Sequence, residues 1–128
     1  MRESDIQTMF SRVYHPNQSE VHELKITKNG RLPFTRLAKQ QEMSLLAIDS
    51  DQGKYHKLSD MSADYKPFDS FFLRNIPAYV VVLFYQPRKP KVLYLIRIAN
   101  FVKLREWSKM KSMTEDEADR FCEKKITL

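Results

Sequence analysis

The pattern of apolar and polar residues at the start of the chain predicts an amphipathic helix. Apolar side chains recur there at spacings of three and four residues, at Ile6, Met9, Phe10 and Val13. This spacing places them on one helical face, so the helix is expected to run to about residue 14. Ser4 or Asp5 is a suitable N-cap residue. Pro16 and the polar residues around it are expected to end the helix.

The next segment, residues 20–27, alternates instead of following a helical period. Three side chains are expected to point to the core, namely His22, Leu24 and Ile26. Val21, Glu23, Lys25 and Thr27 then lie on the opposite face. A period of two is typical of a β-strand with one apolar and one polar face. Residues 28–31 contain Gly30 and are expected to form a turn.

Helices and strands mix in the rest of the chain. Residues 35–48 are predicted to form a helix, and its apolar stripe comprises Phe34, Leu37, Leu45 and Ile48, with Gln41 in line. The expected strands are residues 54–58, a hairpin of 69–73 with 78–85, and 92–98, and a polar loop spans 59–67. Helices are expected at residues 99–107 and, after the capping box Thr114-x-x-Glu117, to about residue 124. The sequence therefore predicts an α/β fold with a mixed central β-sheet flanked by helices.

Composition favours one ordinary globular domain over residues 1–128. Hydrophobic residues make up 42% of the 128 residues and charged residues 30%, which excludes a disordered chain. The single Cys122 excludes an intrachain disulfide and a cysteine-rich zinc site. With only Gly30 and Gly53, the chain lacks a glycine-rich phosphate loop, so no nucleotide cofactor is expected. No apolar run is long enough to cross a membrane, so we expect a cytoplasmic protein without a membrane partner.

The charge distribution indicates a polyanionic partner. The formal net charge is +6, although a small basic protein can simply be basic. One cluster of cations follows the strand of residues 20–27, and its candidate DNA-binding members are Lys28, Arg31, Arg36 and Lys39. A second cluster comprises Arg88, Lys89 and Lys91.

The candidate chemistry begins with Glu23 and Lys25. A spacing of two on a strand places both side chains on one face. A carboxylate there can bind a hard divalent cation, and an ammonium beside it can stabilise charge at a phosphate. By itself, however, such a pair is more often a solvated strand face or an ion pair.

Two further residues extend this candidate site. Gln41 lies in the apolar stripe of its predicted helix, where it is either a core amide bonded to a backbone carbonyl or a group that reaches the Glu23 and Lys25 face. Asp69 opens the predicted hairpin, where it is either a residue of the turn or the additional carboxylate that a magnesium site needs. The active-site alternative predicts that Asp69 and Glu23 share one metal ion.

The order of these residues resembles a known nuclease family. Glu23-Leu-Lys-Ile-Thr-Lys-Asn, followed by Leu32-Pro-Phe-x-x-Leu37-x-x-x-Gln41, resembles the signature of the RecU-like Holliday junction resolvases within the PD-(D/E)xK nuclease superfamily. The resemblance extends from about residue 20 to the C-terminus. It departs from the family at Gln40, where a histidine is common, and upstream, where the hairpin that bears the first catalytic aspartate is missing.

This resemblance implies a restriction-endonuclease-like fold and a function. The family resolves four-way DNA junctions by paired nicks, with Mg²⁺ or Mn²⁺ as cofactor, and works as a homodimer. On that basis the catalytic residues are expected to be Glu23, Lys25, Asp69 and Gln41, and the metal ligands Asp69 and Glu23. Two alternatives remain, a non-catalytic DNA-binding protein that keeps the nuclease fold, and a nuclease that cuts flaps, single strands or RNA.

Other residues have ordinary explanations. Glu3 or Asp5 is expected to interact with the dipole at its helix N-terminus, although either is also a possible additional acid near the metal. The three histidines, His15, His22 and His56, lack zinc-ligand spacing and are interpreted as structural. Trp107 is expected to pack rather than to stack on a base. Among the many rings of the strand region, Tyr85 and Tyr94 are candidates for a dimer surface.

Overall fold

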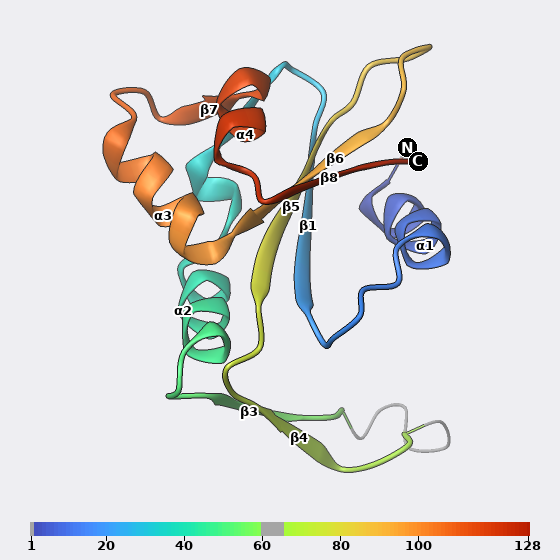
Figure 1. The fold of residues 1–128 in the computed structure, drawn as a ribbon, viewed down its shortest axis with the longest axis vertical. Coiled ribbons are helices and arrows are strands. Elements are labelled where there is room, and N and C mark those ends of the chain that lie inside the picture. Colours follow the sequence, from blue (N-terminus) through green and yellow to red (C-terminus); the bar gives the residue numbers. More distant parts are fainter. Residues whose placement is uncertain (1, 60–65) are drawn as a thin grey trace.

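The computed structural model describes residues 2–59 and 66–128 (Figure 1). Its helices are α1 (Glu3–Val13), α2 (Lys39–Asp49), α3 (Ile98–Trp107) and α4 (Glu115–Phe121), with a short 3₁₀ helix η1 (Phe34–Arg36). Its strands are β1 (Val21–Thr27), β2 (Arg31–Pro33), β3 (Lys54–Lys57), β4 (Ser70–Leu73), β5 (Ala78–Phe84), β6 (Val92–Arg97), β7 (Ser112–Thr114) and β8 (Lys124–Thr127). The expected α/β architecture with a mixed sheet between helices is confirmed.

The main sheet has four strands in the order β1-β5-β6-β8. β1 runs parallel to β5, and β5, β6 and β8 pair antiparallel. The parallel pair requires a crossover, and α2 lies within it, because parallel strands cannot be joined by a tight turn. Every residue of β5 is buried, as its continuous β-branched and apolar sequence predicts for a central strand. β1 lies at one edge of this sheet.

Helices cover both faces of the sheet (Figure 1). The face toward α1 buries alternate side chains of the strands, including Val81, Leu83, Leu93 and Leu95, against Ile6 and Phe10 of that helix. The opposite face buries Val80, Val82 and Ile96 against α2, α3 and α4. Each core therefore uses one face of the strands, as the period of two requires.

The predicted helix of residues 35–48 is shorter than expected. Phe34–Arg36 form the 3₁₀ helix, Leu37 and Ala38 are extended, and α2 begins only at Lys39. The backbone N–H of Phe34 donates to the Lys111 carbonyl, which ties this segment to the chain before β7. Phe34 and Leu37 are still buried in the same core as Leu45 and Ile48. Their helical spacing in the sequence therefore reflects this shared burial, although Phe34 and Leu37 do not belong to α2.

The predicted hairpin of residues 69–73 with 78–85 is wrong. β4 pairs with β3, and β5 pairs with β1 and β6. The reason lies in the linker, where Asn75 has a positive φ of 56° and the N–H of Ile76 donates to the carbonyl of Ile48. The chain is thereby tied to the end of α2 and returns to the sheet beside β1. β3 and β4 form a two-stranded arm that extends away from the main sheet (Figure 1). The middle of the expected polar loop, residues 60–65, lies outside the described residues.

The ends of the chain also differ from the expectation. The last helix ends at Phe121 rather than near residue 124, and β8 follows it beside β6. β2 and β7 form a small antiparallel pair that the pattern did not indicate. These strands have three or four residues each, too few for alternation to be recognised. At the N-terminus the cap is Arg2, whose N–H donates to Asp5, rather than Ser4 or Asp5.

A buried carboxylate joins α1, β1 and β8. The side chain of Glu20 is only 3% exposed and accepts hydrogen bonds from the Tyr14 hydroxyl at 2.9 Å and from Lys124 Nζ at 3.0 Å. His22 Nε2 lies 2.9 Å from the same carboxylate. Desolvation alone raises the pKa of Glu20, but these hydrogen bonds outweigh it and hold the pKa below its usual range. Glu20 is therefore ionised and bridges elements that are distant in sequence.

Replacement of Glu20 by glutamine is expected to lower the free energy of unfolding by about 1–3 kcal/mol at neutral pH, because buried donors lose a charged acceptor. Since the folded pKa is depressed, this contribution is complete above the unfolded value of about 4.5 and is lost as the pH falls through the folded pKa. Urea unfolding of both proteins across that pH range measures the difference. Glu106→Gln on the exposed side of α3 is the control, and equal losses in both variants would contradict the assignment.

Candidate functional site

Glu23 and Lys25 lie on the same face of β1, the face that α2 covers. Lys25 Nζ is 3.4 Å from Glu23 Oε1. The lysine side chain is 11% exposed and the glutamate side chain 32% exposed. The ammonium is therefore largely withdrawn from solvent, while the carboxylate is accessible to a small ligand.

Gln41 connects α2 to this pair. Its Nε2 donates to Glu23 Oε1 at 3.0 Å, and its Oε1 accepts the backbone N–H of Ala38 at 3.1 Å. Gln41 stands at the third position of α2, so the second bond caps the helix N-terminus. The amide is fixed at both ends, which orients the Glu23 carboxylate and leaves its other oxygen, Oε2, available.

The outer edge of β1 is paired with side chains instead of another strand. Glu3 Oε2 accepts the N–H of Ile26 at 3.2 Å, and the Arg36 guanidinium donates to the Ile26 carbonyl at 3.0 Å. Arg36 also donates to Glu3 at 3.1 Å. Alternate residues of a strand direct their backbone groups to the same side, so the carbonyl of Leu24 points to this edge as well.

Two hollows of about 380 Å³ each meet at Glu23. One lies between α1 and the edge of β1, and its walls include Glu3, Glu23 and Leu24. The other lies between α2 and the arm, and its walls include Glu23, Gln41 and His56. Glu23 thus lines both hollows, while its side chain lies on the face that α2 covers. We call the first the α1 hollow and the second the arm hollow.

Asp69 is placed differently from the expectation. It immediately precedes β4 at the outer end of the arm, with a side chain that is 91% exposed and paired with Lys66 at 3.3 Å. It lines neither the α1 hollow nor the arm hollow. The structure therefore brings together Glu23, Lys25 and Gln41, and leaves Asp69 apart from them.

The donor set around Glu23 suits a hydrated hard cation with few protein ligands. Glu23 Oε2, the Leu24 carbonyl and the nearby Glu3 are all oxygen donors, which Mg²⁺ and Mn²⁺ prefer. Mg²⁺ commonly takes only one or two carboxylates and completes its sphere with water and substrate phosphate. Within residues 2–59 and 66–128, however, no three His, Cys, Asp or Glu side chains are grouped closely enough to bind one ion. Any such ion would therefore depend on backbone and substrate oxygens.

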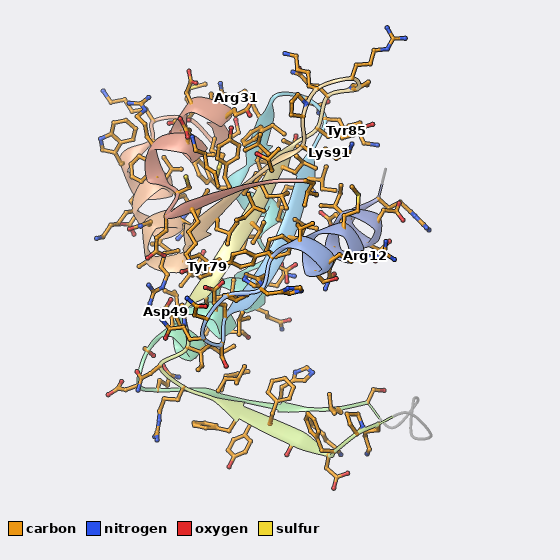
Figure 2. The ribbon with its side chains drawn as sticks, turned by 45° about the vertical axis from the view of Figure 1, so that its right-hand side comes forward. Arg12, Arg31, Asp49, Tyr79, Tyr85 and Lys91 are labelled. Atoms are coloured by element: carbon orange, nitrogen blue, oxygen red, sulfur yellow. The ribbon has the colours of Figure 1, made fainter. Side chains whose placement is uncertain are left out.

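Part of the predicted DNA-binding surface converges at one end of the main sheet. β1 and β5 are parallel and end side by side, so Lys28, which follows β1, lies 6.0 Å from the ring centroid of Tyr85, which follows β5. Arg88 and Lys89 are exposed in the turn after β5, and Lys91 completes that turn. Figure 2 shows Tyr85 and Lys91 together at this end. We call Lys28, Arg88, Lys89 and Lys91 the basic end.

The other predicted DNA-binding residues have different positions. Arg31 donates to the Ser112 hydroxyl at 2.8 Å and to its carbonyl at 3.2 Å, which links β2 to β7. Arg36 is committed to Ile26 and Glu3. Lys39 is exposed at the start of α2. Arg31 and Arg36 therefore have structural partners, whereas Lys39 is accessible to a ligand.

Glu3 and His56 also line the hollows that Glu23 lines. Glu3 is not the dipole partner that was expected, because its carboxylate reaches the edge of β1, whereas Asp5 is the residue that bonds the helix terminus. His56 was interpreted as structural, yet it lines the arm hollow beside Glu23. No sequence signal placed His56 there, because its strand pairs with β4 and this pairing was not predicted.

The exposure of three aromatic residues also bears on what was expected of them. Tyr94 is wrong as a dimer-surface residue, because it is 6% exposed and its hydroxyl donates to Glu115 at 2.7 Å. Tyr85 is half-buried. Trp107 contacts the ring of Phe121 at 5.8 Å but remains 61% exposed.

Among the described residues, no helix is both long and apolar enough to span a membrane.

Comparison with known proteins adds no relative: no family model, no curated protein and no solved structure matches this chain.

The cation site is expected to depend on Glu23 first and Glu3 second. Glu23→Gln should weaken Mn²⁺ binding by about tenfold or more, because it removes a charged ligand from a site with few others. Glu3→Gln should weaken it less, and Asp69→Asn should leave it unchanged. Electron paramagnetic resonance of free Mn²⁺ measures all three affinities. A loss in Asp69→Asn as large as that in Glu23→Gln would instead return Asp69 to the metal site.

Proposed function

We propose that this protein is a Mg²⁺- or Mn²⁺-dependent endonuclease that hydrolyses DNA phosphodiester bonds, and that its preferred substrate is a four-way junction. The observation that carries the proposal is the Glu23–Lys25 pair on one strand face, with Gln41 bonded to the same carboxylate. A solvated ion pair would not require a largely buried lysine or a fixed amide. The arrangement fits a site that holds charges in place before the substrate arrives.

Each residue of the site has a role in this proposal. Glu23, with the Leu24 carbonyl, would hold the divalent cation, which supplies charge stabilisation at the scissile phosphate. Lys25 lies next to Glu23, where its ammonium would stabilise negative charge that develops on the phosphate and orient the attacking water. Gln41 is a positioning residue, because it orients Glu23. Glu3 is the second carboxylate that the geometry favours, and Asp69 stays a prediction that the Mn²⁺ measurement tests.

The fold is compatible with the proposed nuclease class. A parallel pair of strands joined through α2, with Glu23 and Lys25 on the first strand, agrees with the restriction-endonuclease-like core that the sequence resemblance implies. The missing upstream hairpin corresponds to the edge of β1, which Glu3 and Arg36 occupy here. We therefore propose a PD-(D/E)xK core whose edge is closed by side chains.

The substrate and assembly follow from charge and symmetry. The net charge of +6 and the basic end favour a polyanion such as DNA. A four-way junction has two symmetry-related strands, and one subunit with one site cuts one of them. Paired cuts in one encounter therefore require a second site at fixed spacing, which a C₂ homodimer supplies. A solution mass of twice 15.3 kDa in light scattering would support this assembly.

Two alternatives are favoured by specific observations. A non-catalytic DNA-binding protein is favoured by the scarcity of carboxylates around Glu23 among the described residues. A nuclease for flaps, single strands or RNA is favoured by an exposed aromatic ring of the arm, Phe68, since a ring can stack only on a base that is unpaired. A cleavage assay that offers several substrates separates all three functions.

Lys25→Ala is expected to lower junction cleavage by at least about 100-fold, because the loss of one preorganised electrostatic group at a reacting centre has this size. DNA affinity should change little, since only one of many cations is removed. The measurement compares nicking of a four-way junction, a linear duplex and a flap with Mg²⁺. Lys103→Ala, at an exposed lysine of α3, is the control. Cleavage by Lys25→Ala at the wild-type rate would rule out the proposed mechanism.

The basic end is expected to contact DNA phosphates. Replacing both Arg88 and Lys89 by glutamine should reduce the slope of log K against log salt concentration by about 0.9 per lost contact. The control removes two exposed cations from α3 and α4, by Lys103→Gln with Arg120→Gln, and should leave the slope unchanged. Fluorescence anisotropy of labelled junction DNA without metal measures both. Equal slopes in the two double variants would exclude the basic end from the interface.

A further inference from the structure

The arm carries a row of aromatic rings on the face that meets the main body. His56 of β3 and Phe71 of β4 are directly paired, and their ring centroids lie 5.1 Å apart. The ring of Phe68 meets the ring of Phe71 edge-on at 6.3 Å. Phe68, Phe71 and His56, which we call the aromatic row, therefore extend along the arm from its outer end toward its base.

The aromatic row ends at the candidate site. His56 lines the arm hollow, whose other walls include Glu23, Gln40, Gln41 and Ser44. A strand that lay along the row would therefore lead into the hollow that Glu23, Gln41 and Ser44 line. The row and the site form one continuous surface, although they come from segments that are distant in sequence.

Phe68, at the outer end of the row, is exposed to solvent. Phe68 is 52% exposed, and the only ring contact of Phe68 within the described residues is with Phe71. A single exposed apolar residue is ordinary in a protein surface. Rings in contact along a projecting ribbon, which lead into a polar hollow, have the features of a stacking surface for bases.

We propose that the aromatic row binds the unpaired bases of a nucleic-acid strand and guides that strand into the arm hollow. Stacking selects unpaired bases, because a base within a duplex has both of its faces covered by neighbours. Lys54, two residues before His56 on β3, is an exposed cation on the same face of the arm, and it favours a phosphate backbone over an uncharged partner. The proposal rests on the proposed function only in its consequence, that strands with unpaired nucleotides at a branch, a flap or an end are the ones cut.

The opposite face of the arm provides an internal control. Tyr55 and Phe72 are paired there, with ring centroids 4.8 Å apart, and Tyr55 is 72% exposed. Successive side chains of a strand point to opposite faces, so these rings are directed away from the arm hollow. Tyr55 thus matches Phe68 as an exposed ring on the same arm, but it does not lie on the proposed path.

The test measures binding without metal, so that cleavage plays no part. The probe is a short oligonucleotide that carries the fluorescent base 2-aminopurine, offered as single-stranded DNA, as single-stranded RNA and as the matching DNA duplex. Wild-type protein is expected to quench the fluorescence of the single strands. Phe68→Ala and His56→Ala should weaken single-strand binding by about 5- to 150-fold, the range of one lost stacking contact. Tyr55→Ala should stay within about twofold of the wild type, and duplex affinity should not change in any variant. A difference between the DNA and RNA arms identifies the sugar that is preferred.

The outcomes separate this inference from the proposed function. Single-strand binding that is lost in Phe68→Ala, in a protein that cuts no substrate, would support the row and overturn the nuclease. Cleavage of junctions at unchanged rates in Phe68→Ala and His56→Ala, together with unchanged single-strand affinity, would overturn the row alone. Equal effects of Phe68→Ala and Tyr55→Ala, or no quenching by the wild type, would also overturn it. Urea unfolding of each variant verifies that the fold is intact.

Discussion

The parallel pairing of β1 with β5 is the constraint on which the rest of the structure depends. β5 is buried over its whole length between two layers of helices, so its position is fixed by apolar contacts on both of its faces. Pairing with β5 then fixes the register of β1 and the face on which Glu23 and Lys25 lie. A shift of one residue would turn both charged side chains toward α1 and its apolar core, where they would lack these partners.

The same pairing leaves β1 at the edge of the sheet, and this edge is where chemistry is accessible. A free edge presents unpaired N–H and C=O groups that invite association with another strand. Glu3 accepts the N–H of Ile26 and Arg36 donates to its carbonyl, while the carbonyl of Leu24 points to the same edge next to Glu23. An edge strand closed by a carboxylate and a guanidinium thus protects against strand addition and supplies oxygen donors at the candidate site.

The arm gives the candidate site a second wall. An isolated two-stranded hairpin is only marginally stable in water, so this one depends on its attachment to the end of α2 through Asn75 and Ile76. That attachment directs one face of the arm toward Glu23 and the other toward solvent. Both faces of the arm carry aromatic rings, but only one face lies toward the candidate site. Variants of the two faces can therefore be compared experimentally.

The sequence by itself determined the α/β class, the buried central strand and the pairing of Glu23 with Lys25 on one face, because alternation and burial are local consequences of the period of a strand. It did not determine the strand partners, since β3, β4 and β8 are too short to express a period and their pairing depends on where the linkers are anchored. Only the tertiary structure placed Glu3 and His56 in the walls of the hollows that Glu23 lines, Asp69 at the outer end of the arm, and Arg31 in hydrogen bonds with Ser112. These contacts join residues far apart in sequence, and no local pattern of side chains encodes such distances.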